Sequence, residues 1–366
     1  MELRILLLPG DGIGVEVTRE AVKVLRAVAS CFGHDLSLSE GLLGGVAIKE
    51  TGDPFPAETQ RLAAEADATL MGAVGLPEFD NAPPDKRPER GLLGIRKALG
   101  VYANLRPVRS YRALIDSSPI KNELVDGTDM IIVRELTGGL YYGTPRGISG
   151  SGDDERAVNT MSYTRREIER IAHMAFQLAG KRRKKVTSVD KSNVLENSQL
   201  WRRVVTEISA QYSDIALDHV LVDNCAMQLV LSPKRFDIVL TENLFGDILS
   251  DEGAVLAGSI GMLPSASIGP KRPSGAWVGL YEPVHGSAPD IAGQNKANPL
   301  GAIGSVGAML EYSFGLTNEA KAVYAAVEKV LDSGHVTADL KPKSKAAGTN
   351  EVGDAVCEAI AKQTVH

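Results

Sequence analysis

Apolar side chains occur along this chain in two kinds of pattern, and both are present near its beginning. Leu3–Leu8 is a short continuous apolar run, which is typical of a strand buried on both faces of a sheet. From Val15 to Phe32 apolar residues recur at helical spacing, and Gly33 follows at a position where helices commonly end. The chain is therefore predicted to begin with a strand, a turn and a helix.

The same two patterns alternate over the rest of the sequence. Further strands are predicted at Ala68–Val74, Met130–Leu136, Lys185–Lys191, His219–Val222, Asp237–Leu240 and Trp277–Leu280. Helical spacing lies between them, for example at Arg165–Leu178 and Leu200–Tyr212. This alternation predicts an α/β fold with a mainly parallel sheet. Residues 141–163 are rich in glycine and poor in core residues, so we expect a loop or a projecting two-stranded arm there.

Composition limits the possible functions. The 366 residues are enough for two domains, and a formal net charge of -6 disfavours general nucleic-acid binding, which needs a basic surface. The three cysteines lie far apart without a Cys-x-x-Cys pair, so we expect reduced thiols in a cytoplasmic protein. We recognise no signal peptide, and no apolar run approaches the roughly 20 residues of a membrane helix, so no membrane partner is expected.

The turn Gly10-Asp11-Gly12-Ile13-Gly14 follows the first predicted strand and suggests a dinucleotide site. A Rossmann fingerprint needs Gly-x-Gly-x-x-Gly, but Val15 stands where the third glycine should be. No lysine follows the glycines, so the Walker pattern is absent as well. A strand-to-helix turn that simply requires glycine is the stronger explanation of this stretch, although a dinucleotide site stays open as the alternative.

Two acidic residues form the first candidate site. Asp247 and Asp251 are four residues apart, so on a helix they share one face. Paired carboxylates repel each other unless a cation compensates them, and oxygen ligands alone suit Mg²⁺ or Mn²⁺. Asp223, at the end of an apolar strand, could supply a third carboxylate. An exposed acidic helix face explains the same spacing.

Three arginines and one polar loop are further candidates. Arg96, Arg106 and Arg134 each stand beside an apolar run, and guanidinium groups bind carboxylates bidentately. Their convergence would suit a di- or tricarboxylate, whereas separate surface or salt-bridged arginines are the alternative. The loop 282–293 combines small residues, backbone amides, an imidazole and an acid, which suits a nucleotide but is also compatible with an ordinary surface loop.

These motifs together resemble the β-decarboxylating dehydrogenase family, which includes isocitrate and isopropylmalate dehydrogenases. The resemblance covers essentially the whole chain and rests on motifs in a fixed order: PGDGIG at 9–14, LLGIRK at 92–97, NLRP at 104–107, VRELTGGLYYG at 133–143, VDKSNVL at 189–195, NLFGDILSD at 243–251 and EPVHGSAPDIAG at 282–293. It implies a two-lobed α/β fold with a central, mainly parallel sheet. Residues 1–103 and 257–366 would form a cofactor-binding lobe, and residues 104–256 a second lobe with the dimer interface and an arm at about 141–163.

The resemblance also implies roles for individual residues in a homodimer with shared active sites. The substrate would contact Arg96, Arg106, Arg134, Leu92, Leu93 and Asp223 of the partner subunit. Asp247, Asp251 and the partner subunit's Asp223 would hold Mg²⁺ or Mn²⁺. Lys191 of the partner subunit would assist deprotonation of the substrate's C2 hydroxyl, and Tyr141 would deliver a proton after decarboxylation. NAD would be bound by Ile13, Gly75, Leu76, Glu282, His285, Gly286, Ser287, Ala288, Asp290, Ile291 and Asn298.

Substrate and cofactor choice follow from a few of these positions. Isocitrate enzymes, by resemblance, carry polar residues where this chain has Leu92 and Leu93, and two leucines suit an isopropyl group. We therefore expect oxidative decarboxylation of 3-isopropylmalate, in leucine biosynthesis, with isocitrate, homoisocitrate or tartrate/malate as alternative substrates. Asp290 can accept hydrogen bonds from both ribose hydroxyls of NAD and repels the 2′-phosphate of NADP, so NAD is expected.

Two other classes of protein remain to be distinguished. A non-catalytic nucleotide-binding protein explains the glycine turn but leaves the arginines, the paired aspartates and Lys191 without a role. A conventional Rossmann dehydrogenase is disfavoured by the missing third glycine. Cys225 lies close to Asp223 in sequence, and we expect a packing thiol there rather than a metal ligand.

Overall fold

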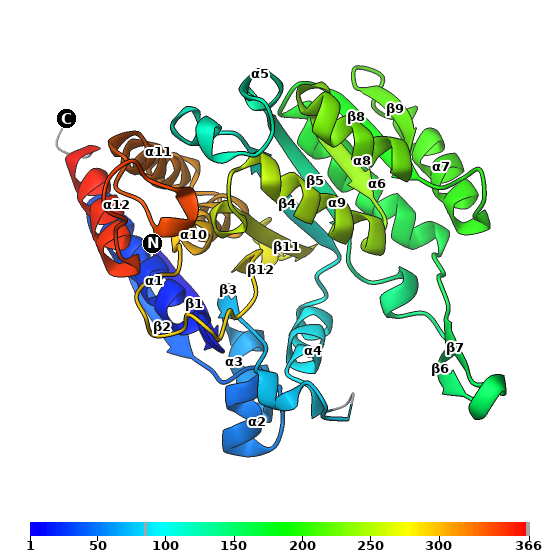
Figure 1. Cartoon of the computed structure of the whole chain (residues 1–366), viewed down its shortest axis with the longest axis horizontal. Coiled ribbons are helices and arrows are strands. Elements are labelled where there is room, and N and C mark those ends of the chain that lie inside the picture. Colours follow the sequence, from blue (N-terminus) through cyan, green and yellow to red (C-terminus); the bar gives the residue numbers. More distant parts are fainter. Residues whose placement is uncertain (84–85, 364–366) are drawn as a thin grey trace. The chain divides into compact units, whose positions relative to one another are not determined.

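The computed structural model describes residues 1–83 and 86–363 (Figure 1). The chain divides into two compact units. Unit 1 comprises Met1–Val101, Ser110–Pro119 and Ala257–His366, and unit 2 comprises Tyr102–Arg109 and Ile120–Leu256. Both ends of the sequence therefore belong to unit 1.

The sheet of unit 1 is mainly parallel. In spatial order its strands are β2 (Asp35–Glu40), β1 (Glu2–Gly10), β3 (Ala68–Ala73), β12 (Trp277–Pro283) and β11 (Pro264–Lys271). Only β11 runs antiparallel to its neighbour β12. The carboxyl ends of β1 and β3 therefore lie at one edge of the sheet, next to the glycine turn after β1.

Seven α-helices complete unit 1 in the described residues. They are α1 (Gly14–Phe32), α2 (Gly45–Thr51), α3 (Ala57–Glu65), α4 (Glu89–Leu99), α10 (Leu300–Tyr312), α11 (Thr317–Ser333) and α12 (Thr349–Gln363). Leu6 and Leu8 lie on the same face of β1, because side chains alternate along a strand, and they are fully buried with Met71 and Ile95. This core fixes α4, the helix that carries Arg96, against the sheet.

Unit 2 also contains mainly parallel strands. Its strands, in spatial order, are β4 (Ala103–Arg109), β5 (Asp129–Glu135), β10 (Ile238–Thr241), β8 (Lys185–Asp190) and β9 (Ala216–Leu221). Only β4 is antiparallel to its neighbour. The helices are α5 (Asn122–Val125), α6 (Arg165–Gly180), α7 (Glu196–Ser209), α8 (Val222–Leu231) and α9 (Asn243–Leu256). A capping box between Thr164 and Glu167 begins α6.

A separate antiparallel hairpin lies within the glycine-rich segment of unit 2. It consists of β6 (Arg146–Ser149) and β7 (Arg156–Asn159), and every residue of both strands is exposed. Figure 1 shows the hairpin extending away from α6 and α7. The predicted two-stranded arm is therefore present.

The predicted α/β class with mainly parallel strands is confirmed. Several predicted strand ends differ from the observed ones, and one of these differences concerns a candidate site residue: β9 stops at Leu221, and Val222 begins α8. Asp223 thus lies in the first turn of a helix rather than at the end of a strand. Among the described residues, no helix is long and apolar enough to cross a membrane.

Candidate active site

The paired aspartates lie on α9 of unit 2, as their spacing predicted. One turn of helix separates Asp247 from Asp251, and their side chains are 32% and 63% exposed. Nη1 of Arg106 lies 3.5 Å from Oδ1 of both residues. The Arg106 guanidinium therefore provides positive charge next to both carboxylates.

Two strands carry the arginines of unit 2 to this helix. Arg106 on β4 is 8% exposed, and its Nε donates to Asn104 Oδ1 (2.9 Å) and its Nη1 to Ser250 Oγ (2.6 Å). Arg134 on the adjacent β5 is 3% exposed, and its Nη1 donates to Asp247 Oδ1. The two arginines thus reach one face of α9 from neighbouring strands.

Tyr141 joins the same cluster. It ends the short 3₁₀ helix η4 (Gly139–Tyr141), and its hydroxyl donates to Asp247 Oδ2 at 2.8 Å. The guanidinium carbon of Arg134 lies 5.7 Å from the centroid of the Tyr141 ring. Burial, followed by the hydrogen bond to Asp247, raises the pKa of Tyr141 to about 12. The phenol therefore keeps its proton at neutral pH.

Lys191 and Asp223 form a separate pair in unit 2. Lys191 Nζ donates to Asp223 Oδ1 at 2.7 Å, and this hydrogen bond holds the pKa of Asp223 below its usual range. In residues 1–83 and 86–363, no group of three or more His, Cys, Asp or Glu side chains could hold a metal ion. A single chain therefore supplies a two-carboxylate site on α9 and a lysine–aspartate pair elsewhere.

The adjacent thiol has no exposed surface. Cys225 is fully buried, and desolvation raises its pKa to about 12. A protonated, buried thiol is a poor metal ligand, because the thiolate is the form that binds metals. This environment supports the packing role expected for Cys225.

The third predicted arginine lies in unit 1. Arg96 in α4 donates from Nη2 to Glu282 Oε1 at 2.7 Å, whereas its Nε is buried without a hydrogen-bond partner. The side chains of Leu92 and Leu93, one turn earlier, are half-buried, and Leu92 packs partly against the core. An unpartnered guanidinium N–H beside apolar side chains suits a carboxylate that also carries an apolar group.

The opening glycine turn and the loop after β12 are joined directly. Ile13 N–H donates to the carbonyl of Ser287 at 2.8 Å. Gly12 has a φ of +56°, and a Cβ there would collide with the Ser287 carbonyl oxygen. Glycine is therefore required for backbone conformation and for close approach to the second loop, as the turn interpretation predicted.

Asp11 was not assigned a role by sequence reasoning, although it lies between these glycines. The carboxylate is 2% exposed and accepts hydrogen bonds from the backbone N–H groups of Gly45, Val46 and Gly75, each at 2.8 Å. Asp11 therefore connects the turn after β1 with the start of α2 and the loop after β3. An acid between two glycines at a strand end is a weak signal that could have suggested such a role.

Replacement of Asp11 by Asn should destabilise unit 1. The amide presents N–H hydrogens where the carboxylate accepts, so at least one backbone N–H loses its buried acceptor. We expect the free energy of unfolding, measured by urea denaturation, to fall by about 2–4 kcal/mol. Asp35→Asn on the exposed start of β2 is the control, with an expected change below about 0.5 kcal/mol. Equal losses in the two variants would contradict the connecting role of Asp11.

The remaining predicted cofactor residues lie around the loop after β12. His285 is buried, and this burial lowers its pKa. Its Nδ1 lies 2.9 Å from the carbonyl oxygen of Gly286, and its Nε2 is buried without a hydrogen-bond partner. Asn298 is buried and donates to Asp339 at 3.0 Å. Asp290 and Gly286 are exposed, Ser287 and Glu282 are buried, and Gly75, Leu76, Ala288 and Ile291 are half-buried. Ile13 is 4% exposed.

Taken together, the two mainly parallel α/β units, the arginine–tyrosine–aspartate cluster and the buried imidazole are typical of a dehydrogenase that acts on a carboxylate substrate. The family model for isocitrate/isopropylmalate dehydrogenase matches residues 4–356. The chain therefore belongs to the isocitrate/isopropylmalate dehydrogenase family.

Individual relatives are similar along their whole length. The chain is 57% identical to a 3-isopropylmalate dehydrogenase of Geobacillus kaustophilus, covering 99% of this chain and 96% of that protein. It is 52% identical to one from Aquifex aeolicus, covering 98% and 97%. Among solved structures, an isocitrate dehydrogenase from Methylococcus capsulatus superimposes with a TM-score of 0.86 at 34% identity, covering 98% of this chain and 99% of that chain.

Proposed function

We propose that this chain catalyses the NAD-dependent oxidative decarboxylation of (2R,3S)-3-isopropylmalate to 4-methyl-2-oxopentanoate and CO₂, a step of leucine biosynthesis. The observation that carries the proposal is the cluster of Arg106, Arg134, Tyr141, Asp247 and Asp251 in unit 2. It combines carboxylate-binding cations, a protonated phenol and two oxygen ligands. The relatives with this name, at 52–57% identity, support the same reaction.

The substrate proposal assigns the carboxylates to Arg96, Arg106 and Arg134. Each arginine is at least half-buried, so its interaction with an anion is weakly screened by water. Leu92 and Leu93 would contact the isopropyl group, whereas isocitrate would place an uncompensated carboxylate there. Burial of the apolar group is expected to contribute about 1–3 kcal/mol of discrimination.

The proposed metal is Mg²⁺ or Mn²⁺, held by Asp247, Asp251 and Asp223 of the partner subunit. The donors are oxygen atoms only, which fits a hard divalent cation, and the two side chains on α9 are accessible to solvent. When bound, the ion would polarise the C2 oxygen of the substrate. Among residues 1–83 and 86–363, no third carboxylate joins the α9 pair in a metal-binding group, which is consistent with the proposed contribution of Asp223 from a second subunit.

The chain's own residues would then move two protons. Lys191 of the partner subunit would assist deprotonation of the C2 hydroxyl, and NAD, when bound, would supply the hydride acceptor for C2. The carboxylate on C3 leaves as CO₂ once C2 is a ketone, and the electron pair of the broken C–C bond is delocalised onto the ketone oxygen. Tyr141 then donates its proton to C3 as the general acid.

The homodimer required for these shared residues is part of the proposal. Large apolar side chains on α8 and α9 are exposed, with Met227 at 56%, Leu231 at 58% and Ile248 at 58% exposure. Surfaces of this kind on adjacent helices are typical of an interface. Analytical ultracentrifugation should give twice the chain mass, and a purely monomeric active enzyme would contradict shared sites.

The proposed cofactor-binding lobe comprises residues 1–103 and 257–366. His285 Nε2, buried without a partner, fits a hydrogen bond from a nucleotide base, and Ile13, Gly75, Leu76 and the loop 282–298 complete the proposed NAD site. Asp290 would accept hydrogen bonds from the adenosine ribose. We also propose a cytoplasmic location, which three free cysteines favour.

Asp290 should determine cofactor affinity. We expect Asp290→Ala to raise the KM for NAD about tenfold, because a ribose loses a charged acceptor, and to leave the KM for 3-isopropylmalate unchanged. NADH absorbance in steady-state assays measures both constants. If Asp290→Ala barely changed the KM for NAD and Ile13→Ala raised it strongly, the roles of the two loops would be reversed.

One assay tests the proposed function as a whole. Protein, NAD, 3-isopropylmalate and Mg²⁺ are mixed, and NADH and CO₂ are followed with and without a chelator. Chelator-sensitive production of both supports the proposal, whereas nucleotide binding without turnover indicates a non-catalytic protein. A higher kcat/KM for isocitrate, homoisocitrate or malate would contradict the assigned substrate.

A further inference from the structure

The Asn243 side chain helps to set the orientation of the Arg134 guanidinium. Nε and Nη2 of Arg134 both donate to Asn243 Oδ1, at 3.0 and 2.8 Å, and both residues are at most 3% exposed. A guanidinium is planar, so two hydrogen bonds to one acceptor fix the plane and its rotation. The Nη1 edge of Arg134 is thereby directed toward Asp247.

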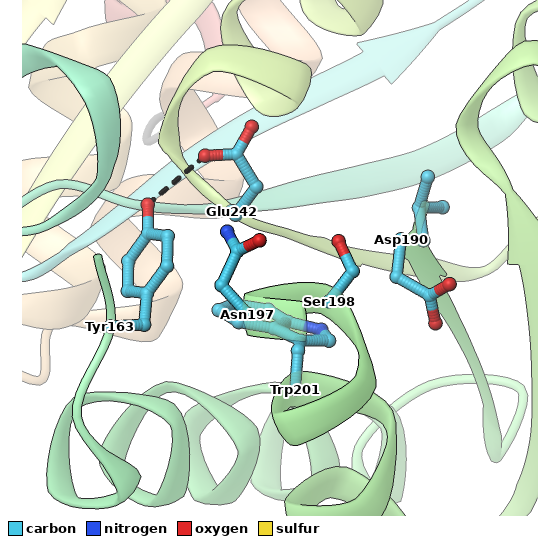
Figure 2. A pocket seen from close by; sticks show the side chains of 7 residues that line it. Tyr163, Asp190, Asn197, Ser198, Trp201 and Glu242 are labelled. Atoms are coloured by element: carbon cyan, nitrogen blue, oxygen red, sulfur yellow. Dashed lines mark hydrogen bonds between the residues drawn. The ribbon is translucent and has the colours of Figure 1, made fainter. Parts of the chain in front are cut away.

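Asn243 is itself held by two further contacts. Its Nδ2 donates to the carbonyl of Gly138 at 3.0 Å, and its backbone N–H donates to the phenol oxygen of Tyr163 at 3.0 Å. The Tyr163 hydroxyl in turn donates to Glu242 Oε2 at 3.1 Å, the contact drawn in Figure 2. The chain of contacts therefore runs from Glu242 through Tyr163 and Asn243 to Arg134.

Glu242 anchors this chain of contacts to the beginning of α9. Its carboxylate is buried, and Oε1 accepts the backbone N–H of Phe245 at 2.6 Å. Burial raises the pKa of the Tyr163 phenol, so Tyr163 remains a neutral donor. The same helix carries Asp247 one turn later, which couples the position of Asp247 to that of Arg134.

The Tyr163 ring is fixed from two sides. The ring of Trp201 meets it edge to face, with centroids 5.6 Å apart and an interplanar angle of 71°. Tyr163 also lies against the Gly138–Gly139 turn that leads to Tyr141, where a Cβ at Gly139 would collide with the phenol oxygen. Figure 2 shows Tyr163, Trp201 and Glu242 around one small pocket.

We propose that Asn243 and Tyr163 are positioning residues that hold Arg134 for the substrate carboxylate. The inference rests on the proposed function, in which Arg134 binds that carboxylate. Neither residue is expected to touch the substrate, and their effect is exerted through the orientation of the guanidinium. Loss of either contact should weaken substrate binding, with little effect on the cofactor.

Two variants and one matched control test this inference. Tyr163→Phe removes only the bridging hydroxyl, and Asn243→Ala removes the acceptor for Arg134. Tyr212→Phe is the control, because the Tyr212 hydroxyl also bonds a side chain of unit 2, His173 at 2.9 Å, away from Arg134. KM values for 3-isopropylmalate and for NAD, together with Tm, are measured for all four proteins.

We expect the KM for 3-isopropylmalate to rise about fivefold in Tyr163→Phe and about tenfold or more in Asn243→Ala. The KM for NAD should stay within about twofold in both variants, and neither constant should change in Tyr212→Phe. Unchanged substrate KM values in Tyr163→Phe, or equal rises for both ligands, would overturn the inference. Tyr163→Phe preserves the test if Asn243→Ala does not fold.

The wild-type assay separates this result from the proposed function. If the wild type oxidises another family substrate instead, the assigned substrate is wrong, and the same comparison is made with that substrate. A selective KM effect with it would still support the positioning role. If the wild type oxidises 3-isopropylmalate and neither variant changes the KM for it, the positioning role is contradicted and the proposed function is not.

Discussion

Tyr141→Phe is expected to lower kcat for 3-isopropylmalate by about 100- to 10,000-fold, the contribution typical of a general acid. The substitution removes the proton donor and the hydrogen bond to Asp247 while retaining the ring against Arg134. With a pKa of about 12, the wild-type phenol is protonated below that pH and loses its proton only as the pH rises through it. Steady-state kinetics of the wild type and of Tyr141→Phe measure this loss of kcat.

Tyr142→Phe provides the matched control for this prediction. Tyr142 is adjacent in sequence and equally exposed, at 36%, so the same atom is removed next to the site. We expect kcat to remain within about twofold of the wild type. Equal losses in both variants would assign the effect to local structure, and a normal kcat in Tyr141→Phe would exclude the phenol as the proton donor.

The sequence predicted those elements whose apolar pattern matches their burial. The run Leu3–Leu8 predicted β1, and helical spacing followed by Gly33 predicted α1, which ends with Gly33 at a φ of +72°. In β2, by contrast, only Leu36 and Leu38 are apolar, because it is an edge strand with little burial, and it was not predicted. Edge strands leave a weak pattern since one side lacks a neighbour.

The candidate site was predictable only where it depends on local spacing. Asp247 and Asp251 share a face because α9 is a helix, and four-residue spacing shows this in advance. The proximity of Arg106 to these aspartates requires the pairing of β4 with β5 and the packing of α9 on both strands. A single sequence contains no information on such non-local contacts, so the roles of Asn243 and Asp11 were not predicted.

Asp247→Asn is expected to abolish most activity, with kcat/KM reduced by about 1,000-fold or more at the Mg²⁺ concentration that saturates the wild type. The variant loses an anionic metal ligand, and activation of the C2 oxygen by a bound ion contributes several kcal/mol, each 1.36 kcal/mol being a factor of ten. It also loses the carboxylate that accepts hydrogen bonds from Arg134 and Tyr141. The buried guanidinium groups of Arg106 and Arg134 then lose the negative charge of Asp247 with which both are paired.

Glu252→Gln separates the metal role of Asp247 from a general loss of charge on α9. Glu252 is half-buried on the same helix, but its position five residues later places it on a different face. We expect this control to keep the wild-type Mg²⁺ dependence and to show the same Mg²⁺-induced rise in Tm. The rise in Tm should be lost in Asp247→Asn, since a ligand stabilises only the protein that binds it. Retention of both the Tm shift and the activity in Asp247→Asn would show that the metal is bound elsewhere.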